Sequence, residues 1–255
     1  MPTQKSKAKS FRSLHVPGSP LVLFNAWDAG SAKAVTAAGA KAIATGSWSV
    51  AKANGFDDGE DLPLDLALAN LARIIKAADL PVTIDLEKGY GAVPAAVGKT
   101  IRRSIEAGAI GCNVEDSLPG TGKLRSVADQ VRRIAQARKA ADATGIAYFI
   151  NGRTDVFFQK PAEKHDAAMV ADALERARAY ADAGADGLFV PGLIDAQLMA
   201  KIAAASPLPV NIMVSGGTPP LRVLAKAGIA RVSHGPRPYL LAMKALEEAA
   251  RAAWA

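Results

Sequence analysis

The chain has 255 residues, of which 50% are hydrophobic, and carries a formal net charge of +7 at pH 7. No apolar run approaches the ~20 residues that a membrane-spanning helix requires, so we expect no such helix and no membrane partner. The one cysteine, Cys112, excludes a framework of disulfides within the chain and is typical of a reducing compartment. Because no secretory signal is visible either, we expect a cytoplasmic protein.

The first residues are strongly basic, with three lysines and Arg12 close together. We predict a flexible basic tail over residues 1–12 and a single catalytic domain over residues 13–255. Such a tail could touch nucleic acid, but no aromatic or arginine-rich recognition pattern accompanies it. We therefore expect no nucleic-acid partner.

Predicted strands and helices alternate along the rest of the chain. We expect strands, in chain order, at residues 21–25, 42–45, 81–85, 111–116, 147–153, 187–191, 210–214 and 229–233. Helices are expected at residues 31–38, 65–78, 93–107, 127–144, 167–183, 195–204, 221–227 and 239–254. Eight strands alternating with eight helices in ~250 residues predict a single (β/α)8 TIM barrel, an α/β fold. A doubly wound open sheet is the alternative, which we disfavour because no glycine-rich fingerprint follows the first strand.

The third predicted strand carries the most informative residues. Its β-branched Val82, Thr83 and Ile84 are followed by Asp85 and, two positions later, by Glu87. In a strand, this spacing places both carboxylates on one side. They repel each other unless protons or a cation lie between them, and a divalent ion such as Mg²⁺ prefers oxygen ligands. The alternative is that Glu87 is a solvated loop residue and Asp85 a helix cap.

Polar side chains also follow the other predicted strands. Because the active sites of (β/α)8 barrels lie at the carboxyl ends of the strands, these side chains are the candidate site residues. Asp58, on the loop after the second strand, can reach the same end of the barrel. Carboxylates converging there would repel one another unless they bound a metal ion and cations. The candidates are Asn25 and Asp28, Thr45, Gly46 and Ser47, Asp85 and Glu87, Asn113, Glu115 and Asp116, Asn151 and Arg153, Asn211, and Ser233 and His234.

Arg153 is the natural cation for this acidic end, since a guanidinium can hold a carboxylate or phosphonate through two hydrogen bonds. The alternative for Arg153 is a structural salt bridge to Asp155 or Glu115. Gly46 and Ser47 offer consecutive backbone N–H groups to a substrate carboxylate or a developing oxyanion.

Three further features have alternative interpretations. His234 is a candidate for substrate contact or proton transfer. Cys112 lies inside an apolar strand, so we expect a packed thiol rather than a nucleophile. Residues 214–217 and the turn after the eighth strand lie where many barrels bind phosphate, which indicates a rival function: a metal-independent barrel enzyme acting on a sugar phosphate.

Five segments resemble the isocitrate lyase/phosphoenolpyruvate mutase superfamily, from about residue 11 to residue 240. They are Asn25-Ala-Trp-Asp-Ala-Gly-Ser31, Asp85-Leu-Glu-Lys-Gly-Tyr-Gly91, Asn113-Val-Glu-Asp-Ser117, Gly152-Arg-Thr-Asp155 and Phe189-Val-Pro-Gly192. The resemblance implies a barrel that depends on Mg²⁺, with Mn²⁺ as an alternative. It also implies that C–C or P–C bonds next to a 2-oxo acid are cleaved or formed through a pyruvate-like enolate.

By position, the resemblance implies that Asp85 binds the metal directly. Gly46 and Ser47 match the backbone cradle for the substrate, and Arg153 matches the arginine at the reacting centre. The residues expected around the metal, mainly through its waters, are Asp58, Glu87 and Glu115, of which Asp58 and Glu115 are also expected to position water or relay protons. Further expected substrate contacts are Thr45, Asn113, Asn211 and His234.

The loop after the fourth strand departs from the superfamily. Isocitrate and methylisocitrate lyases carry a catalytic cysteine there, whereas residues 117–125 contain none. Isocitrate-type substrates are therefore unexpected. Mutases and phosphonopyruvate hydrolases carry a lysine and an asparagine nearby; here only Lys123 is available, displaced by about two positions. We expect Lys123 or Arg125 to enter the site as the loop closes. Gly192 follows Pro191 where the lyases have a glutamate, which again disfavours substrates that need an extra carboxylate-binding pocket.

The expected function is that of a Mg²⁺-dependent lyase or phosphonomutase-like enzyme acting on a small 2-oxo acid or phosphonate. Oxaloacetate-type decarboxylation, retro-aldol cleavage and phosphonopyruvate-type chemistry stay open. Of these reactions, decarboxylation depends least on the missing cysteine, because its bond-breaking step needs no strong base. A non-catalytic homologue that binds a 2-oxo acid is a further alternative. From the resemblance we expect a homodimer or homotetramer whose last helices are exchanged or packed together.

Overall fold

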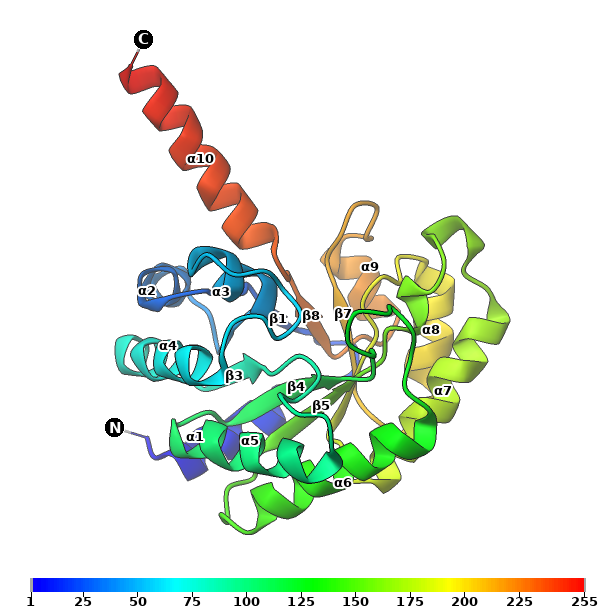
Figure 1. The fold of residues 1–255 in the computed structure, drawn as a ribbon. Coiled ribbons are helices and arrows are strands. Elements are labelled where there is room, and N and C mark those ends of the chain that lie inside the picture. The colour runs from blue at the N-terminus through cyan, green and yellow to red at the C-terminus, as the bar shows by residue number, and fades with distance from the viewer. Residues whose placement is uncertain (1, 255) are drawn as a thin grey trace.

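The computed structural model describes residues 2–254 and contains one sheet of eight parallel strands (Figure 1). The strands are β1 (Leu21–Leu23), β2 (Ile43–Ala44), β3 (Val82–Asp85), β4 (Gly111–Glu115), β5 (Phe149–Arg153), β6 (Gly187–Phe189), β7 (Val210–Met213) and β8 (Arg231–Ser233). They pair in the order β1-β8-β7-β6-β5-β4-β3-β2. Between β1 and β2, Ala26 N–H donates to Ala44 O at 2.9 Å, and Ala26 forms a parallel bridge with Thr45. This contact closes the circle, so the predicted (β/α)8 barrel is confirmed.

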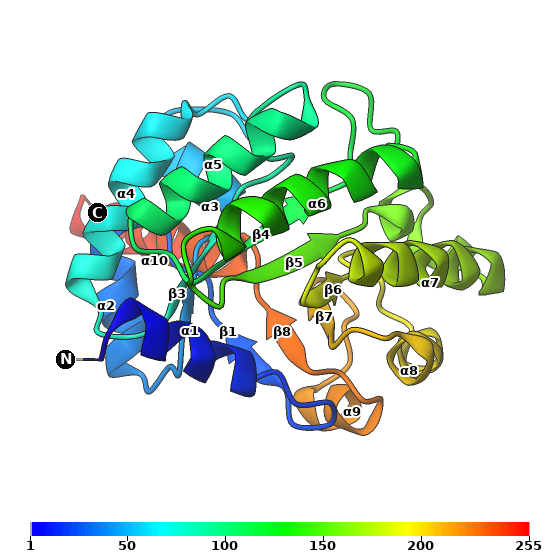
Figure 2. The same ribbon diagram turned by 90° about the horizontal axis from the view of Figure 1, so that it is seen from below.

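Helices connect the strands and cover the outside of the barrel (Figure 2). They are α2 (Ala29–Ala37), α4 (Leu64–Ala77), α5 (Pro94–Glu106), α6 (Val127–Asp142), α7 (Ala167–Asp182), α8 (Ala196–Ala205) and α9 (Leu221–Lys226). Three short elements were not predicted: α3 (Ser47–Ala53), directly after β2, and the 3-10 helices η1 (Val156–Phe158) and η2 (Ala162–Lys164), after β5. At the start of α2, Asp28 accepts a hydrogen bond from Ser31 N–H at 2.7 Å, so this candidate site residue is a helix cap.

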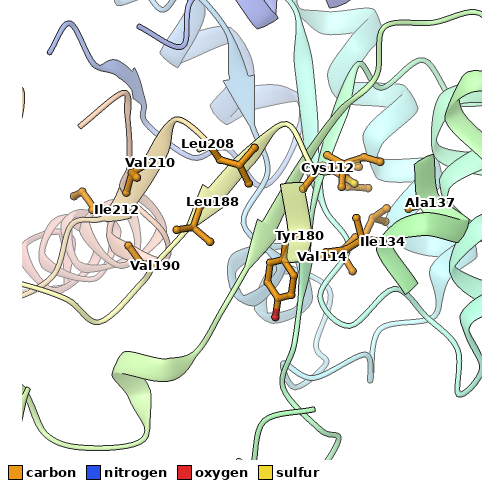
Figure 3. Close-up of a cluster of buried hydrophobic side chains, with 14 of the residues drawn as sticks. Cys112, Val114, Ile134, Ala137, Tyr180, Leu188, Val190, Leu208, Val210 and Ile212 are labelled. Atoms are coloured by element: carbon orange, nitrogen blue, oxygen red, sulfur yellow. The ribbon is translucent and has the colours of Figure 1, made fainter. Parts of the chain in front are cut away.

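The main hydrophobic core lies between the strands and the surrounding helices (Figure 3). Cys112 and Leu188 from the strands are drawn there beside Ile134 and Tyr180 from α6 and α7. Because the Cys112 thiol is fully buried, its pKa is raised to about 12, and the prediction of a packed thiol is confirmed. The residues that alternate with these along the strands point into the barrel. They include the buried polar side chains of Asn113, Asn151, Asn211 and Arg231.

α1 (Gln4–Ser13) replaces the predicted flexible tail, so that prediction is wrong. Ala8 and Phe11 lie three positions apart, hence on one face of the helix, and both are fully buried. The Phe11 ring packs edge-on against Phe149 with the centroids 5.5 Å apart. Although most of α1 is polar, this one apolar face is enough to hold it against the amino-terminal end of the barrel (Figure 2).

α10 (Arg237–Ala253) extends away from the barrel (Figure 1). No helix within residues 2–254 combines the length and the apolar character needed to cross a membrane. The outer side of β1 is bordered by a groove of about 650 Å³. Apolar residues lining the groove include Val16, Val22, Phe24 and Val35. The exposed apolar residues of α10 itself include Leu240, Leu241, Met243 and Leu246.

Candidate active site

A cavity of about 220 Å³ lies at the carboxyl ends of the strands. This is the end of a (β/α)8 barrel at which active sites form, because the loops that follow the strands meet there. Eight of the predicted site residues line the cavity. They are Asn25, Gly46, Ser47, Asp58, Asp85, Asn113, Arg153 and Ser233.

Asp85 ends β3 and is partly buried, with its carboxylate at this cavity. Ser47 Oγ donates to Asp85 Oδ2 at 3.3 Å, and Glu87 N–H donates to Asp85 Oδ1 at 3.2 Å. The Asp85 N–H in turn donates to Thr45 Oγ1 at 3.0 Å, so Thr45 fixes the backbone that carries the carboxylate. Burial raises the pKa of Asp85, and the positive charge of Arg153 acts in the opposite direction. No ion pair to Asp85 is formed within the described chain.

Glu87 and Glu115 lie on either side of a buried ammonium group, that of Lys88. Lys88 Nζ is 3.4 Å from Glu115 Oε1 and 3.9 Å from Glu87 Oε2. Glu87 adopts φ 49°, a left-handed conformation that is strained for a residue with a side chain, and Gly59 N–H donates to its Oε2 at 2.8 Å. Burial, followed by the charges of Asp58 and Asp85, raises the pKa of Glu87 to about 8. The charges of three predicted carboxylates, those of Asp58, Asp85 and Glu115, therefore act on Glu87.

Arg153 ends β5 and is held by two carboxylates. Its Nη1 lies 2.8 Å from Glu115 Oε2, and its Nε donates to Asp155 Oδ1 at 2.6 Å. Both ion pairs considered as structural alternatives in the sequence are thus present. The rings of Phe158 and Phe189 also lie beside the guanidinium, each with its centroid 5.8 Å from Arg153 Cζ.

The carboxylates of this site suit a hard divalent cation. Burial is the main cause that raises the pKa of Asp85, Glu87 and Glu115, the last to about 7, which means that ionising them in the protein is unfavourable. Lys88 and Arg153 are the nearby cations, and neither contacts Asp85. Within residues 2–254 no three acidic, histidine or cysteine groups gather closely enough to hold a metal together. Mg²⁺ is often bound by one or two carboxylates and several waters, and Asp85 is the group that could supply the direct contact.

Several predicted residues lie outside the cavity. Lys123 is exposed on a hairpin closed by a bridge between Ser117 and Leu124. The ring of His234 lies against Phe24, with the centroids 4.9 Å apart, and only its backbone N–H contacts a cavity residue, Asn25 Oδ1 at 2.9 Å.

Two other predicted residues have structural partners. Asn211 is buried in the barrel interior, where its Oδ1 accepts a hydrogen bond from Ser233 Oγ at 3.2 Å. Asp116 is paired with Arg176 at 3.0 Å and accepts a hydrogen bond from Tyr180 at 2.7 Å, so it joins β4 to α7 instead of facing the cavity.

The structure also adds residues to the site that the sequence did not single out. Lys88 is one of them, and the signal for it in the sequence is a positive charge directly after Glu87 and three residues after Asp85. The remaining additions line the cavity with apolar side chains, for which no local pattern in the sequence exists. They are Trp48, Phe158, Phe189, Met213 and Pro236.

Comparison with known proteins gives consistent matches. Residues 11–254 match the family model described as phosphoenolpyruvate phosphomutase. The crystal structure of a proposed phosphonomutase from Burkholderia cenocepacia is 58% identical, with a TM-score of 0.96 and coverage of 98% of this chain and 99% of that one. The 2-methylisocitrate lyase of Escherichia coli is 30% identical over 222 residues, 84% of this chain and 72% of the lyase. An oxaloacetate decarboxylase of a Bradyrhizobium species is 32% identical over 205 residues, 74% of this chain and 66% of the decarboxylase.

Proposed function

Because this chain belongs to the phosphoenolpyruvate phosphomutase family of the isocitrate lyase superfamily, we propose that it is a Mg²⁺-dependent enzyme acting on a small 2-oxo acid. The reaction is the cleavage or rearrangement of a C–C or P–C bond at C3 through a pyruvate-like enolate. The observation that carries the proposal is Asp85, a partly buried carboxylate at the cavity with hydrogen-bond donors around it but no ion-pair partner in the described chain.

The residues around the cavity have distinct roles in this scheme. Bound at Asp85, with Asp58, Glu87 and Glu115 accepting hydrogen bonds from its waters, Mg²⁺ would supply a Lewis acid that draws electrons from the 2-oxo group. Ser47 lies next to Asp85 and, with the adjoining backbone, would hold the substrate carboxylate.

Arg153 and Asp58 complete the scheme. Arg153 is fixed by Glu115 and Asp155 before any substrate arrives, so its positive charge is already oriented where an enolate would form. Asp58 lines the cavity and is exposed, which makes it the carboxylate best placed to exchange protons between substrate and solvent.

Binding of oxalate, a planar mimic of the enolate, tests this proposal. Titration calorimetry with Mg²⁺ should detect oxalate binding that disappears with a chelator and falls at least about 100-fold in Asp85→Asn, since each group at such a site contributes several kcal/mol. Asp195→Asn is the matched control, because Asp195 caps α8, does not line the cavity, and asparagine caps equally well. Oxalate binding that is unchanged by the chelator, or by Asp85→Asn, would contradict the proposal.

We also infer that the protein forms a homo-oligomer through α10. In a closed (β/α)8 barrel each strand is followed by a helix on the outer wall. Here α10 extends away from the wall, while the groove of about 650 Å³ beside β1 is lined by apolar residues. A second copy of the chain would cover both apolar surfaces at once, which supports a dimer as the smallest unit.

A further inference from the structure

The active-site cavity has an apolar part for which the proposed chemistry has no use. Its polar part, with Ser47, Asp85 and Arg153, is sufficient for a 2-oxo carboxylate. The apolar lining comes from five different segments of the barrel. Its side chains are Trp48, Phe158, Phe189, Met213 and Pro236.

The position of Phe158 depends on a specific backbone feature of the neighbouring loop. Gly192, after β6, has φ +85°, and a Cβ atom there would lie 2.9 Å from Phe158 Cδ1 and 3.1 Å from Phe157 O. A side chain at position 192 would therefore displace the Phe158 ring, besides straining the backbone. Two loops cooperate to place this ring at the mouth of the cavity.

The charges of the cavity disfavour a second anionic group on the substrate. Arg153 is the one cation among the residues that line it, and its Nε, Nη1 and Nη2 already serve Asp155 and Glu115. Asp58 and Asp85 line the same space. A second carboxylate or a phosphonate placed against Phe158 and Phe189 would lose its hydrating water and find no unpaired cation in the cavity lining. It would also be repelled by Asp58 and Asp85.

We propose that the substrate is a 4-hydroxy-2-oxo monocarboxylate with an apolar group on C4, which the enzyme cleaves to pyruvate and an apolar aldehyde. This inference rests on the proposed function and specifies the fragment that leaves C3. The C3–C4 bond breaks, and its electron pair forms the C2–C3 enolate. The C4 hydroxyl proton passes to Asp58 as C4 becomes the aldehyde carbonyl, and the same proton then returns to C3 to give pyruvate, so no other reactant is required.

A series of substrates that differ only at C4 tests the inference. The probes are 4-hydroxy-2-oxopentanoate, with a methyl group, 4-hydroxy-2-oxo-4-phenylbutanoate, with a phenyl group, and 4-hydroxy-2-oxoglutarate, with a carboxylate. Pyruvate release with Mg²⁺ is measured through lactate dehydrogenase. We expect kcat/KM for the better of the two apolar substrates to exceed that for the carboxylate at least tenfold, because even one methylene in a fitting pocket is worth about tenfold. Equal or greater kcat/KM for 4-hydroxy-2-oxoglutarate, or for oxaloacetate in parallel, overturns the inference.

Variants of Phe158 connect the preference to the apolar wall. Phe158 is 48% exposed, so its replacement should leave the fold intact. Phe158→Arg should lower kcat/KM for the apolar substrates and raise it for 4-hydroxy-2-oxoglutarate, whereas Phe158→Leu should keep the original order. Lys123→Met removes the cation of the exposed hairpin. If the parent enzyme prefers 4-hydroxy-2-oxoglutarate and Lys123→Met loses that preference, Lys123 selects the substrate instead of the apolar wall. The inference is then wrong.

A separate measurement distinguishes failure of this inference from failure of the proposed function. Exchange of the pyruvate methyl protons with D₂O, followed by NMR, reports enolate formation without any leaving group. If none of the C4 series is cleaved while Mg²⁺-dependent exchange proceeds, the assigned substrate class is wrong and the proposed function stands. If exchange is absent as well, both fail.

Discussion

Glu115 and Arg153 face each other in the register of β4 and β5 and form an ion pair of 2.8 Å. Both residues end their strands, so the pair lies where the two strands open into the candidate active site. Glu115 also approaches Lys88, and Arg153 is bound on its other side by Asp155. The orientation of the guanidinium is therefore set by the protein and does not depend on a substrate.

Replacing Arg153 by lysine should separate its charge from its geometry. An ammonium cannot serve Glu115 and Asp155 through a planar fork, so we expect Arg153→Lys to lower the rate of Mg²⁺-dependent pyruvate exchange about 100-fold. Circular dichroism should show an unchanged fold. Arg132→Lys is the control, because Arg132 forms an exposed pair with Asp129 on α6. An exchange rate within a factor of two of the parent enzyme would remove Arg153 from the proposed chemistry.

The raised pKa values of the acidic cluster predict how stability without metal depends on pH. Burial and neighbouring carboxylates raise the pKa of Glu87 from 4.5 to about 8, and burial raises that of Glu115 to about 7. Between pH 4.5 and 8 the folded state therefore binds more protons than the unfolded state, so stability falls as pH rises across this window. Each such group contributes up to about 1.4 kcal/mol per pH unit.

Thermal unfolding in the presence of a chelator checks this dependence. We expect Tm to be lower at pH 8 than at pH 5.5, a smaller difference when Mg²⁺ is present, and a smaller difference in Glu87→Gln. Tm values that rise steadily with pH in the chelator would show that the carboxylates are satisfied without a metal.

The parts of the site that depend on strand register could be predicted from the sequence. Asp85, Glu115 and Arg153 each end a short apolar strand, and parallel pairing brings neighbouring strand ends together without any knowledge of side-chain packing. The barrel itself follows from the same regular alternation of strands and helices.

Contacts between segments far apart in the chain could not be predicted in this way. The 3.4 Å approach of Lys88 to Glu115 depends on the left-handed turn at Glu87, which local propensity disfavours. The placement of Phe158 depends on Gly192, in a different loop. The polar composition of α1 predicts a tail, because only two of its residues, Ala8 and Phe11, are buried.

His15, just after α1, should make the protein sensitive to acid. Its ring stacks on Phe149 with the centroids 4.1 Å apart, and burial followed by the charge of Arg231 lowers its pKa from 6.5 to about 3. Because the unfolded state takes up the proton and the folded state does not, this residue contributes stability above pH 6.5 that is lost as pH falls toward 3. At pH 5 the loss is about 2 kcal/mol.

Denaturant unfolding of His15→Gln isolates this contribution. The variant should be less stable than the parent at pH 7.5, since it loses the stacking on Phe149. The difference in unfolding free energy between the two proteins should be smaller by about 2 kcal/mol at pH 5. The same change at His165, which is half-buried beside Phe157, serves as control. If the difference in unfolding free energy between parent and variant does not change with pH, His15 takes up its proton in the folded state as readily as in the unfolded state.

The exposed face of α10 predicts a specific loss of assembly. Met243 and Leu246 lie three positions apart on one side of the helix, and 36% and 63% of their surfaces are exposed. Two glutamates there would place charges against the apolar groove of a second copy, so Met243→Glu combined with Leu246→Glu should give a monomer by light scattering while the barrel stays folded. Phe24→Glu, in the groove, should have the same effect from the other side of the interface. Glu248→Lys changes a charge on the side of α10 that faces away from Met243 and Leu246, and it should leave the assembly intact. A parent protein that is monomeric at micromolar concentration, or a double variant that still associates, would mean that α10 and the groove do not meet.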